Sequence, residues 1–304
     1  SEFETKSRNF VFMKKIVVAS DSFKGSLTSF EVAAAVEAGI RNVFPQCTVV
    51  KANVADGGEG TVDAIVKALG GYIHTTAVAD PLGRQIEAAY GIVTLNGVQT
   101  AIIEMSTASG LPLLHPDERN PWVTSTYGTG ELIRDALRKG CRKFLVGIGG
   151  SATNDAGTGM LSALGARFLD SRGQQLKGCG AALKSIARID LSSLMPEARR
   201  SEFIVACDVN TPFCGPDGAA YVFAPQKGAD PQMTTALDEG MCSFARIIAG
   251  QFGKDITSLR GAGAAGGLGG AFNAFLNAGL TPGIEMVLDA IGFDSMLEGA
   301  DLVL

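Results

Sequence analysis

Apolar residues along the chain recur with two alternating periods, one typical of strands and the other of helices. Short runs rich in β-branched residues predict strands, and longer segments with apolar residues three and four positions apart predict helices. This alternation indicates βαβ units, so the sequence predicts an α/β fold with a mainly parallel sheet. The predicted strands are 16–19, 48–54, 101–104, 144–148, 166–169 and 203–207, and the predicted helices are 29–44, 61–69, 131–139, 155–164, 231–252 and 271–278.

Residues 72–100 depart from this alternation. They contain short alternating runs separated by two turn sequences, Asp80-Pro-Leu-Gly-Arg84 and Asn96-Gly97. Turns of this kind join antiparallel strands. We therefore expect an antiparallel region here and a domain boundary close to it.

The two ends of the sequence lead to separate predictions. Residues 1–12 are interpreted as a remnant of cloning, because Met13-Lys-Lys-Ile-Val-Val is typical of a natural start. Residues 300–304 predict a buried strand that has no crossover helix after it. The chain is therefore expected to be truncated at that end.

Composition excludes several classes of protein. The net charge is −5 and there is no basic run, which argues against a nucleic-acid partner. No apolar stretch approaches the roughly 20 residues of a membrane span, and we expect no signal peptide. The six cysteines include no CxxC pair, so we interpret them as reduced, in a cytoplasmic protein. His74 and His115 have no metal-ligand neighbours in sequence, which argues against a histidine zinc site or a Ser-His-Asp triad.

Polar residues follow the first predicted strand directly. Asp21, Ser22 and Lys24 form a short loop, and Thr28 with Glu31 makes a capping box that starts the next helix. In open α/β sheets, ligands bind at the carboxyl ends of the strands. Lys24 is therefore a candidate catalytic residue for a carboxylate or a transferring phosphoryl group, and Asp21 and Ser22 are candidate substrate-binding residues.

Two further strand ends carry acidic residues. Asp56 and Glu59 lie among glycines after the second strand, and Asp208 and Asn210 follow the strand at 203–207. Asp56 and Asp208 are candidate catalytic residues, and Glu59 and Asn210 candidate substrate contacts. An acid and an amide two residues apart suit Mg²⁺ or a hydroxyl group. The structural alternatives are a tight turn with a helix cap at the first position and an Asx turn at the second.

Two glycine-rich segments are candidate phosphate sites. The first, 147–159, supplies backbone N–H groups, hydroxyls and an amide, and the second, 261–270, precedes a predicted helix. The candidate phosphate-binding residues are Gly149, Gly150, Ser151, Thr153, Gly263, Gly266 and Gly267, and Asn154 is a candidate substrate contact. There is no Walker A sequence. Lys227, in a loop at 225–229, is interpreted as a solvated lysine.

Several of these segments, in this order, resemble the bacterial glycerate kinase type 1 family. The segments are 20–26, 55–61, 80–84, 147–155, 207–210 and 224–228, and the resemblance extends from Met13 to Leu304. It implies phosphorylation of D-glycerate by ATP to 2-phosphoglycerate, in glycerate and glyoxylate catabolism. The choice of 2- over 3-phosphoglycerate as product rests on the resemblance alone.

The resemblance also implies two α/β domains, one inserted into the other. The expected Rossmann-like domain comprises residues 13–76 and 286–304, and the expected inserted domain comprises 77–285. Members of the family continue beyond the position of Leu304, so the Rossmann-like domain is expected to be incomplete here.

Phosphoryl transfer needs ATP, Mg²⁺, an acceptor hydroxyl and a group that accepts its proton. Asp56 and Asp208 are the candidates for the base and the metal ligand, and the sequence does not assign which is which. One alternative is an NAD-dependent reductase, which would use Gly147, Gly149 and Ala152 for pyrophosphate and Asp170 for ribose. The other alternative is a non-catalytic protein that binds a small molecule. The sequence leaves the oligomeric state open.

Overall fold

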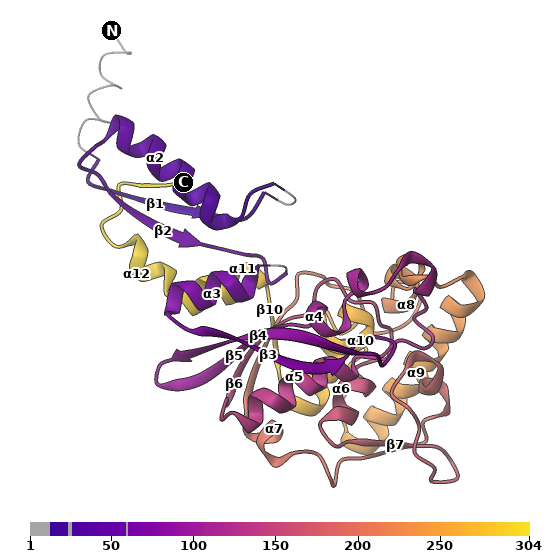
Figure 1. Ribbon diagram of the computed structural model, residues 1–304. Helices are drawn as coiled ribbons and strands as arrows, with labels where there is room; N and C mark the ends of the chain where they lie inside the picture. The colour runs from indigo at the N-terminus through magenta and orange to yellow at the C-terminus, as the bar shows by residue number, and fades with distance from the viewer. Residues whose placement is uncertain (1–12, 24–25, 59) are drawn as a thin grey trace.

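The computed structural model describes residues 13–23, 26–58 and 60–304. Strands in these residues form a three-stranded sheet, a six-stranded sheet and a two-stranded sheet, here called the small sheet, the large sheet and the hairpin. The small sheet and its helices form a lobe beside a larger lobe that holds the other two (Figure 1). Helices alternate with strands through most of the chain, so the predicted α/β class is confirmed.

The small sheet consists of parallel strands in the order β11-β1-β2. Its strands are β11 (Leu302–Val303), β1 (Lys15–Ser20) and β2 (Thr48–Asn53). Side chains alternate between the two faces of a strand. Ile16 and Val18 of β1 pack beneath α2 (Ser29–Val43), whereas Val17 packs with α3 and α11 on the other face. The central strand is therefore buried on both sides.

Strand β11 forms an edge of the small sheet, so the prediction that residues 300–304 are buried is wrong. It pairs with β1 through Ile16↔Leu302 and Val17↔Val303. Val303 and Leu304 are 48% and 50% exposed.

The large sheet is parallel on one side and antiparallel on the other. Strands β5, β6, β9 and β10 are parallel, whereas β3, β4 and β5 are antiparallel, which confirms the prediction for residues 72–100. The order across the sheet is β10 (Gly279–Thr281), β9 (Glu202–Ala206), β6 (Lys143–Gly147), β5 (Val98–Glu104), β4 (Gln85–Leu95) and β3 (Tyr72–Ala79). The hairpin consists of β7 (Arg167–Leu169) and β8 (Arg188–Asp190). The four parallel strands bring their carboxyl ends to one edge.

Helices cover both faces of the large sheet. On one face, Ile65 of α3 and Val287 of α11 belong to the same buried cluster as Ile102 and Leu145 of the sheet. On the other face, Phe144 belongs to a larger cluster with residues of α5, α6, α9 and α10. The helices other than α2 are α3 (Thr61–Leu69), α4 (Ser106–Ser109), α5 (Tyr127–Arg138), α6 (Thr158–Ala163), α7 (Pro196–Arg200), α8 (Ala219–Phe223), α9 (Pro231–Phe252), α10 (Ala264–Leu276), α11 (Gly283–Ile291) and α12 (Phe293–Leu297). Among the described residues, no helix has the length and apolar character of a membrane span.

One buried cluster joins the two sheets. It contains Val17 of the small sheet, Ile102 of the large sheet, and residues of α3 and α11 between them. The predicted division into domains stays a prediction. Its first boundary, between residues 76 and 77, falls inside β3, and its second, between 285 and 286, falls inside α11.

Cys214 and Cys242 form a disulfide bond, so the prediction that every cysteine is reduced is wrong for this pair. Their Cα atoms are 5.5 Å apart, which is ordinary for a disulfide. The bond links the loop after β9 to helix α9 across 28 residues of sequence. The spacing of the two cysteines in the sequence does not predict this disulfide, because they come together only when α9 packs against that loop.

Candidate active site

The loop that follows β2 lies directly against the carboxyl edge of the large sheet. A Cβ atom added to Gly147, at the end of β6, would lie 2.0 Å from the Gly57 carbonyl oxygen. A Cβ atom on Gly283 would lie 1.8 Å from the Asp56 carbonyl oxygen. The backbones approach so closely because glycine has no side chain at these positions. The loop that contains Asp56 follows a strand of the small sheet, and this contact positions it at the carboxyl ends of the strands of the large sheet.

A cavity of about 980 Å³, here called the main cavity, opens at this edge. The two predicted catalytic aspartates line it together: Asp56 comes from the loop after β2, and Asp208 from the loop after β9. Asp56 Oδ1 accepts a hydrogen bond from the Gly58 amide at 3.0 Å, and Asp208 Oδ1 accepts one from the Gly283 amide at 2.9 Å. Both side chains are exposed, so they can contact a bound ligand.

The first predicted phosphate segment forms another wall of the main cavity. Gly149, Gly150 and Ser151 follow β6 and line the cavity. Both glycines are exposed, and a Cβ atom on Gly149 would meet no atom within 4 Å. Gly150 has a φ of +72°, a conformation found where successive backbone N–H groups form an anion-binding concavity. A ligand can therefore approach this backbone closely.

Lys227 lies at the inner wall of the main cavity, so its interpretation as a solvated lysine is wrong. It ends the 3₁₀ turn η4 (Pro225–Lys227) and is only 1% exposed. Its Nζ atom donates hydrogen bonds to Ser151 Oγ and to the Thr153 carbonyl oxygen, both at 2.7 Å. Burial lowers the pKa of Lys227 to about 7, and the nearby charge of Asp155 opposes this shift.

Asp155 is a buried carboxylate beneath the cavity wall. It accepts hydrogen bonds from the amides of Thr126, Gly157 and Gly159 and from the Thr126 hydroxyl. The Thr126 hydroxyl itself accepts from the Met160 amide at 2.9 Å, which leaves its proton for Asp155. Burial raises the pKa of Asp155, whereas these donors lower it. Because every contact is a donor, we assign the side chain as ionised, with a negative charge close to Lys227.

Thr153 and Asn154 point into the protein, although the sequence predicts phosphate and substrate contacts for them. Both are fully buried and lie outside the described lining of the cavities. Asn154 Nδ2 donates to Met241 Sδ at 3.2 Å, while Thr153 Oγ1 and Asn154 Oδ1 have no partner in the described part of the chain. The segment turns inward after Ser151, because the Ala152 amide donates to the Ser109 carbonyl oxygen.

The second predicted phosphate segment lies behind the first. Gly263, Gly266 and Gly267 are buried, and a Cβ atom on Gly266 would lie 2.2 Å from the Thr153 carbonyl oxygen. The Gly266 carbonyl oxygen accepts from the Ala156 amide at 2.9 Å. Close packing thus explains these glycines. The segment contributes to the main cavity through Ala264 and Ala265, and its contact with nucleotide phosphates stays a prediction.

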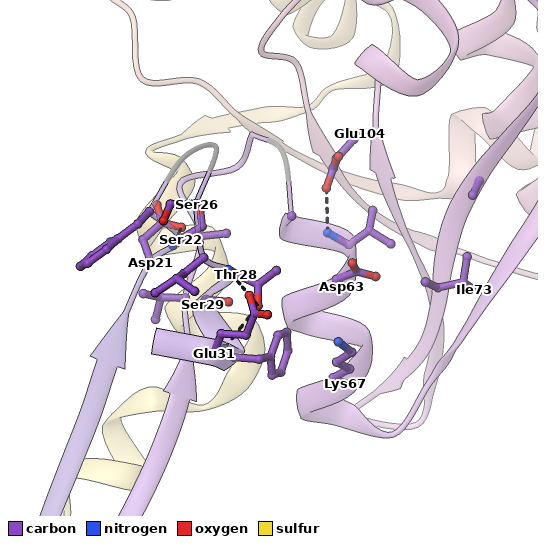
Figure 2. Close-up of a pocket in the computed structure, with 18 of the residues that line it drawn as sticks. Asp21, Ser22, Ser26, Thr28, Ser29, Glu31, Asp63, Lys67, Ile73 and Glu104 are labelled. Carbon is purple, nitrogen blue, oxygen red and sulfur yellow. Dashed lines mark hydrogen bonds between the residues drawn. The ribbon is translucent and has the colours of Figure 1, made fainter. Parts of the chain in front are cut away.

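A second cavity of about 550 Å³ adjoins the first and lies beside the start of α2 and α3. Glu104, the last residue of β5, and Thr107, which follows that strand, line both cavities. Figure 2 shows Glu104 above the first turn of α3, where its Oε1 accepts from the Val62 amide at 2.9 Å. It also shows Asp21 and Ser22, two predicted substrate residues, on the opposite wall.

The remaining predicted residues are Lys24, Glu59 and Asn210. Lys24 and Glu59 lie outside the described residues. Asn210 is exposed and lies outside the described lining of both cavities. The capping box predicted for α2 is confirmed, because Glu31 and Thr28 exchange hydrogen bonds between side chain and backbone (Figure 2).

The position of Asp170 gives the dinucleotide alternative no support. A dinucleotide fold starts a helix within its glycine fingerprint. Here α6 begins only at Thr158, and Asp170 lies in the turn after β7. Its Oδ1 accepts from the Arg172 and Gln174 amides, both at 2.8 Å. The carboxylate therefore stabilises a hairpin turn and lies outside the described lining of the cavities.

Comparison with known proteins places this arrangement in a family. Residues 16–304 match the sequence profile of the glycerate kinase family. Glycerate kinase of Halalkalibacterium halodurans is 47% identical over 292 residues, which are 96% of this chain and 76% of that protein. Glycerate 2-kinase of Escherichia coli K12 is 44% identical over 95% of this chain and 76% of its own length. A crystal structure from Salmonella typhimurium LT2, of a protein proposed to be glycerate kinase 2, matches with a TM-score of 0.92 and 46% identity over 96% of this chain and 78% of that chain. The chain therefore belongs to the glycerate kinase family.

Proposed function

We propose that this protein transfers the terminal phosphoryl group of ATP to a hydroxyl group of D-glycerate and forms 2-phosphoglycerate. The observation that carries the proposal is the shared main cavity. Two aspartates from different sheets, an exposed glycine loop and a buried lysine line it together. Phosphoryl transfer needs these groups: acids for a metal ion and a proton, and backbone amides with a cation for the phosphates.

The two aspartates divide two tasks between them. One accepts the proton of the glycerate hydroxyl, and the other holds Mg²⁺. Carboxylate oxygens are ligands that Mg²⁺ prefers, and one or two of them suffice when substrate phosphates complete the coordination. Asp56 and Asp208 fit this donor set, because both are exposed in the main cavity. When bound, Mg²⁺ would neutralise charge on the phosphates.

The other chain segments bind and orient the reactants. We assign the ATP phosphates to Gly149, Gly150 and Ser151, since these residues combine an open backbone with a hydroxyl group. Asp21 and Ser22 line the adjoining cavity and are proposed substrate contacts. The roles of Lys24 and Glu59 stay predictions from the sequence. A cytoplasmic location, where ATP is supplied, also stays a prediction.

Incubation with D-glycerate, ATP and Mg²⁺ is expected to release ADP in proportion to glycerate consumed. A coupled assay measures the ADP, and ³¹P NMR distinguishes 2-phosphoglycerate from 3-phosphoglycerate by the position of the new ester. Omission of Mg²⁺ or of glycerate should abolish the release. Formation of 3-phosphoglycerate would overturn the assignment of the 2-hydroxyl group. Oxidation of NADH without ADP release would instead favour a reductase.

A further inference from the structure

The Lys227 amine can donate one more hydrogen bond than the described chain accepts, and a further neighbour is the Phe223 ring, whose centroid lies 6.0 Å from Nζ. Among the described residues, its Nζ atom has two hydrogen-bond acceptors, Ser151 Oγ and the Thr153 carbonyl oxygen. A neutral amine has two protons, which these acceptors satisfy, whereas an ammonium group has three. The third proton needs an acceptor, because an unpaired charged donor is costly in a buried position. The wall of the main cavity is where a ligand could supply that acceptor.

We propose that Lys227 binds an anionic oxygen of the phosphoryl group being transferred, and that it takes up a proton from solvent as the nucleotide binds. This inference rests on the proposed function and adds a residue to it. Ser151 and the Thr153 carbonyl hold the amine at the end of the glycine loop, so that the loop and the amine act on the same anion. Lys227 then stabilises the negative charge that develops on the phosphoryl oxygens.

The surroundings favour a phosphoryl group over the carboxylate of glycerate. Lys227 bonds to Ser151, and Ser151 directly follows the exposed Gly149 and Gly150. An open glycine backbone, a hydroxyl group and a cation together can contact several oxygens of one tetrahedral anion. A carboxylate offers only two oxygens.

A change in the charge of Lys227 on ligand binding can be measured as proton uptake. The titratable or charged groups around it are Asp155 behind the wall, Glu104, Asp56, Cys207 and Asp208 on the wall, and Arg119 beside Gly228. Burial lowers the pKa of Lys227 to about 7. Above that pH the free amine is mostly neutral, and a bound anion raises its pKa. Binding of the anion is therefore accompanied by proton uptake, and proton uptake is largest between the pKa values of the free and bound forms.

Calorimetric titration with ATP, in two buffers of different ionisation enthalpy, tests the proposal on the intact protein. At about pH 8 the wild type is expected to take up close to one proton more per bound ATP than Lys227→Met. The Met side chain has similar length and no charge. Loss of a charged hydrogen bond is expected to raise the Kd for ATP about 10- to 100-fold. Lys184→Met is the matched control, because this lysine is 66% exposed and pairs with Glu239, and it should change neither quantity.

The outcomes separate the proposal from its alternatives. Wild-type protein that binds ATP without proton uptake would overturn it, and this measurement decides even if Lys227→Met does not fold. Proton uptake on addition of glycerate alone, and none with ATP or inorganic phosphate, would assign the amine to the substrate carboxylate instead. Proton uptake with ATP but no turnover of glycerate would contradict the proposed function and leave the role of Lys227 intact. Normal turnover of glycerate and an unchanged Kd for ATP in Lys227→Met would overturn the role of Lys227 and leave the proposed function intact.

Discussion

The Asp56→Asn variant is expected to lose at least about 100-fold in kcat, the usual effect of removing an acid–base group. The amide cannot accept the proton of the substrate hydroxyl and is a weaker ligand for Mg²⁺. Its oxygen can still accept the Gly58 amide proton, so the loop should keep its shape. We expect the free energy of unfolding to change by less than about 0.5 kcal/mol. Steady-state kinetics and denaturant titration measure the two effects.

Asp170→Asn is the matched control for this substitution. Asp170 also accepts backbone hydrogen bonds at the start of a turn, but that turn follows β7 and lies outside the described cavity walls. Its replacement should leave kcat unchanged. If Asp56→Asn retained full activity, Asp56 would be only a structural residue of the loop. Activity lost in Asp170→Asn alone would revive the dinucleotide alternative.

The Gly283→Ala variant is expected to lose both activity and stability. The added methyl group would lie 1.8 Å from the Asp56 carbonyl oxygen and 2.9 Å from the Gly57 nitrogen. These are backbone atoms, so relief requires the loop or helix α11 to move, and such overpacking costs about 1–3 kcal/mol. The Gly283 amide also donates to Asp208. Both aspartates would therefore shift, and a displacement of about 1 Å can reduce kcat about 100-fold.

Gly279→Ala provides the comparison within the same part of the chain. A Cβ atom there would meet no atom within 4 Å, so its free energy of unfolding should change by less than about 0.5 kcal/mol. Denaturant titration and kcat are measured for both variants. Wild-type stability and rate in Gly283→Ala would show that the loop after β2 does not rest on α11 as described.

The rule that ligands bind at the carboxyl ends of parallel strands correctly predicts part of the site. Asp56 and Asp208 each follow a strand, and parallel strands bring such positions to one edge. Both line the main cavity. Glu104 obeys the same rule, because it ends the apolar run of β5 and lies between both cavities. It could have been identified in the same way.

The rest of the site depends on contacts between distant segments. Lys227 sits in a loop, and its burial arises because η4 packs beneath Ser151, which is 76 residues away in sequence. The sequence shows hydroxyl and amide groups at Thr153 and Asn154, but not that the chain turns inward after Ser151. Glycines at 263, 266 and 267 are suitable for a phosphate loop and for close backbone packing, and local sequence does not separate these two uses.

The pairing of β1 with β11 has a consequence for the order of folding. Lys15 and Asp301, whose carboxylate accepts the Lys15 amide proton, are 286 residues apart. Contacts at such separation form late, because closing a long loop costs entropy before any pairing is gained. At translation rates of about 5–20 residues per second, β1 waits about 15 to 60 s before its neighbour exists. During that interval β2 pairs with the other edge of β1 and α2 packs on one face, so the edge that will pair with β11 exposes backbone groups that can pair with another chain and cause aggregation.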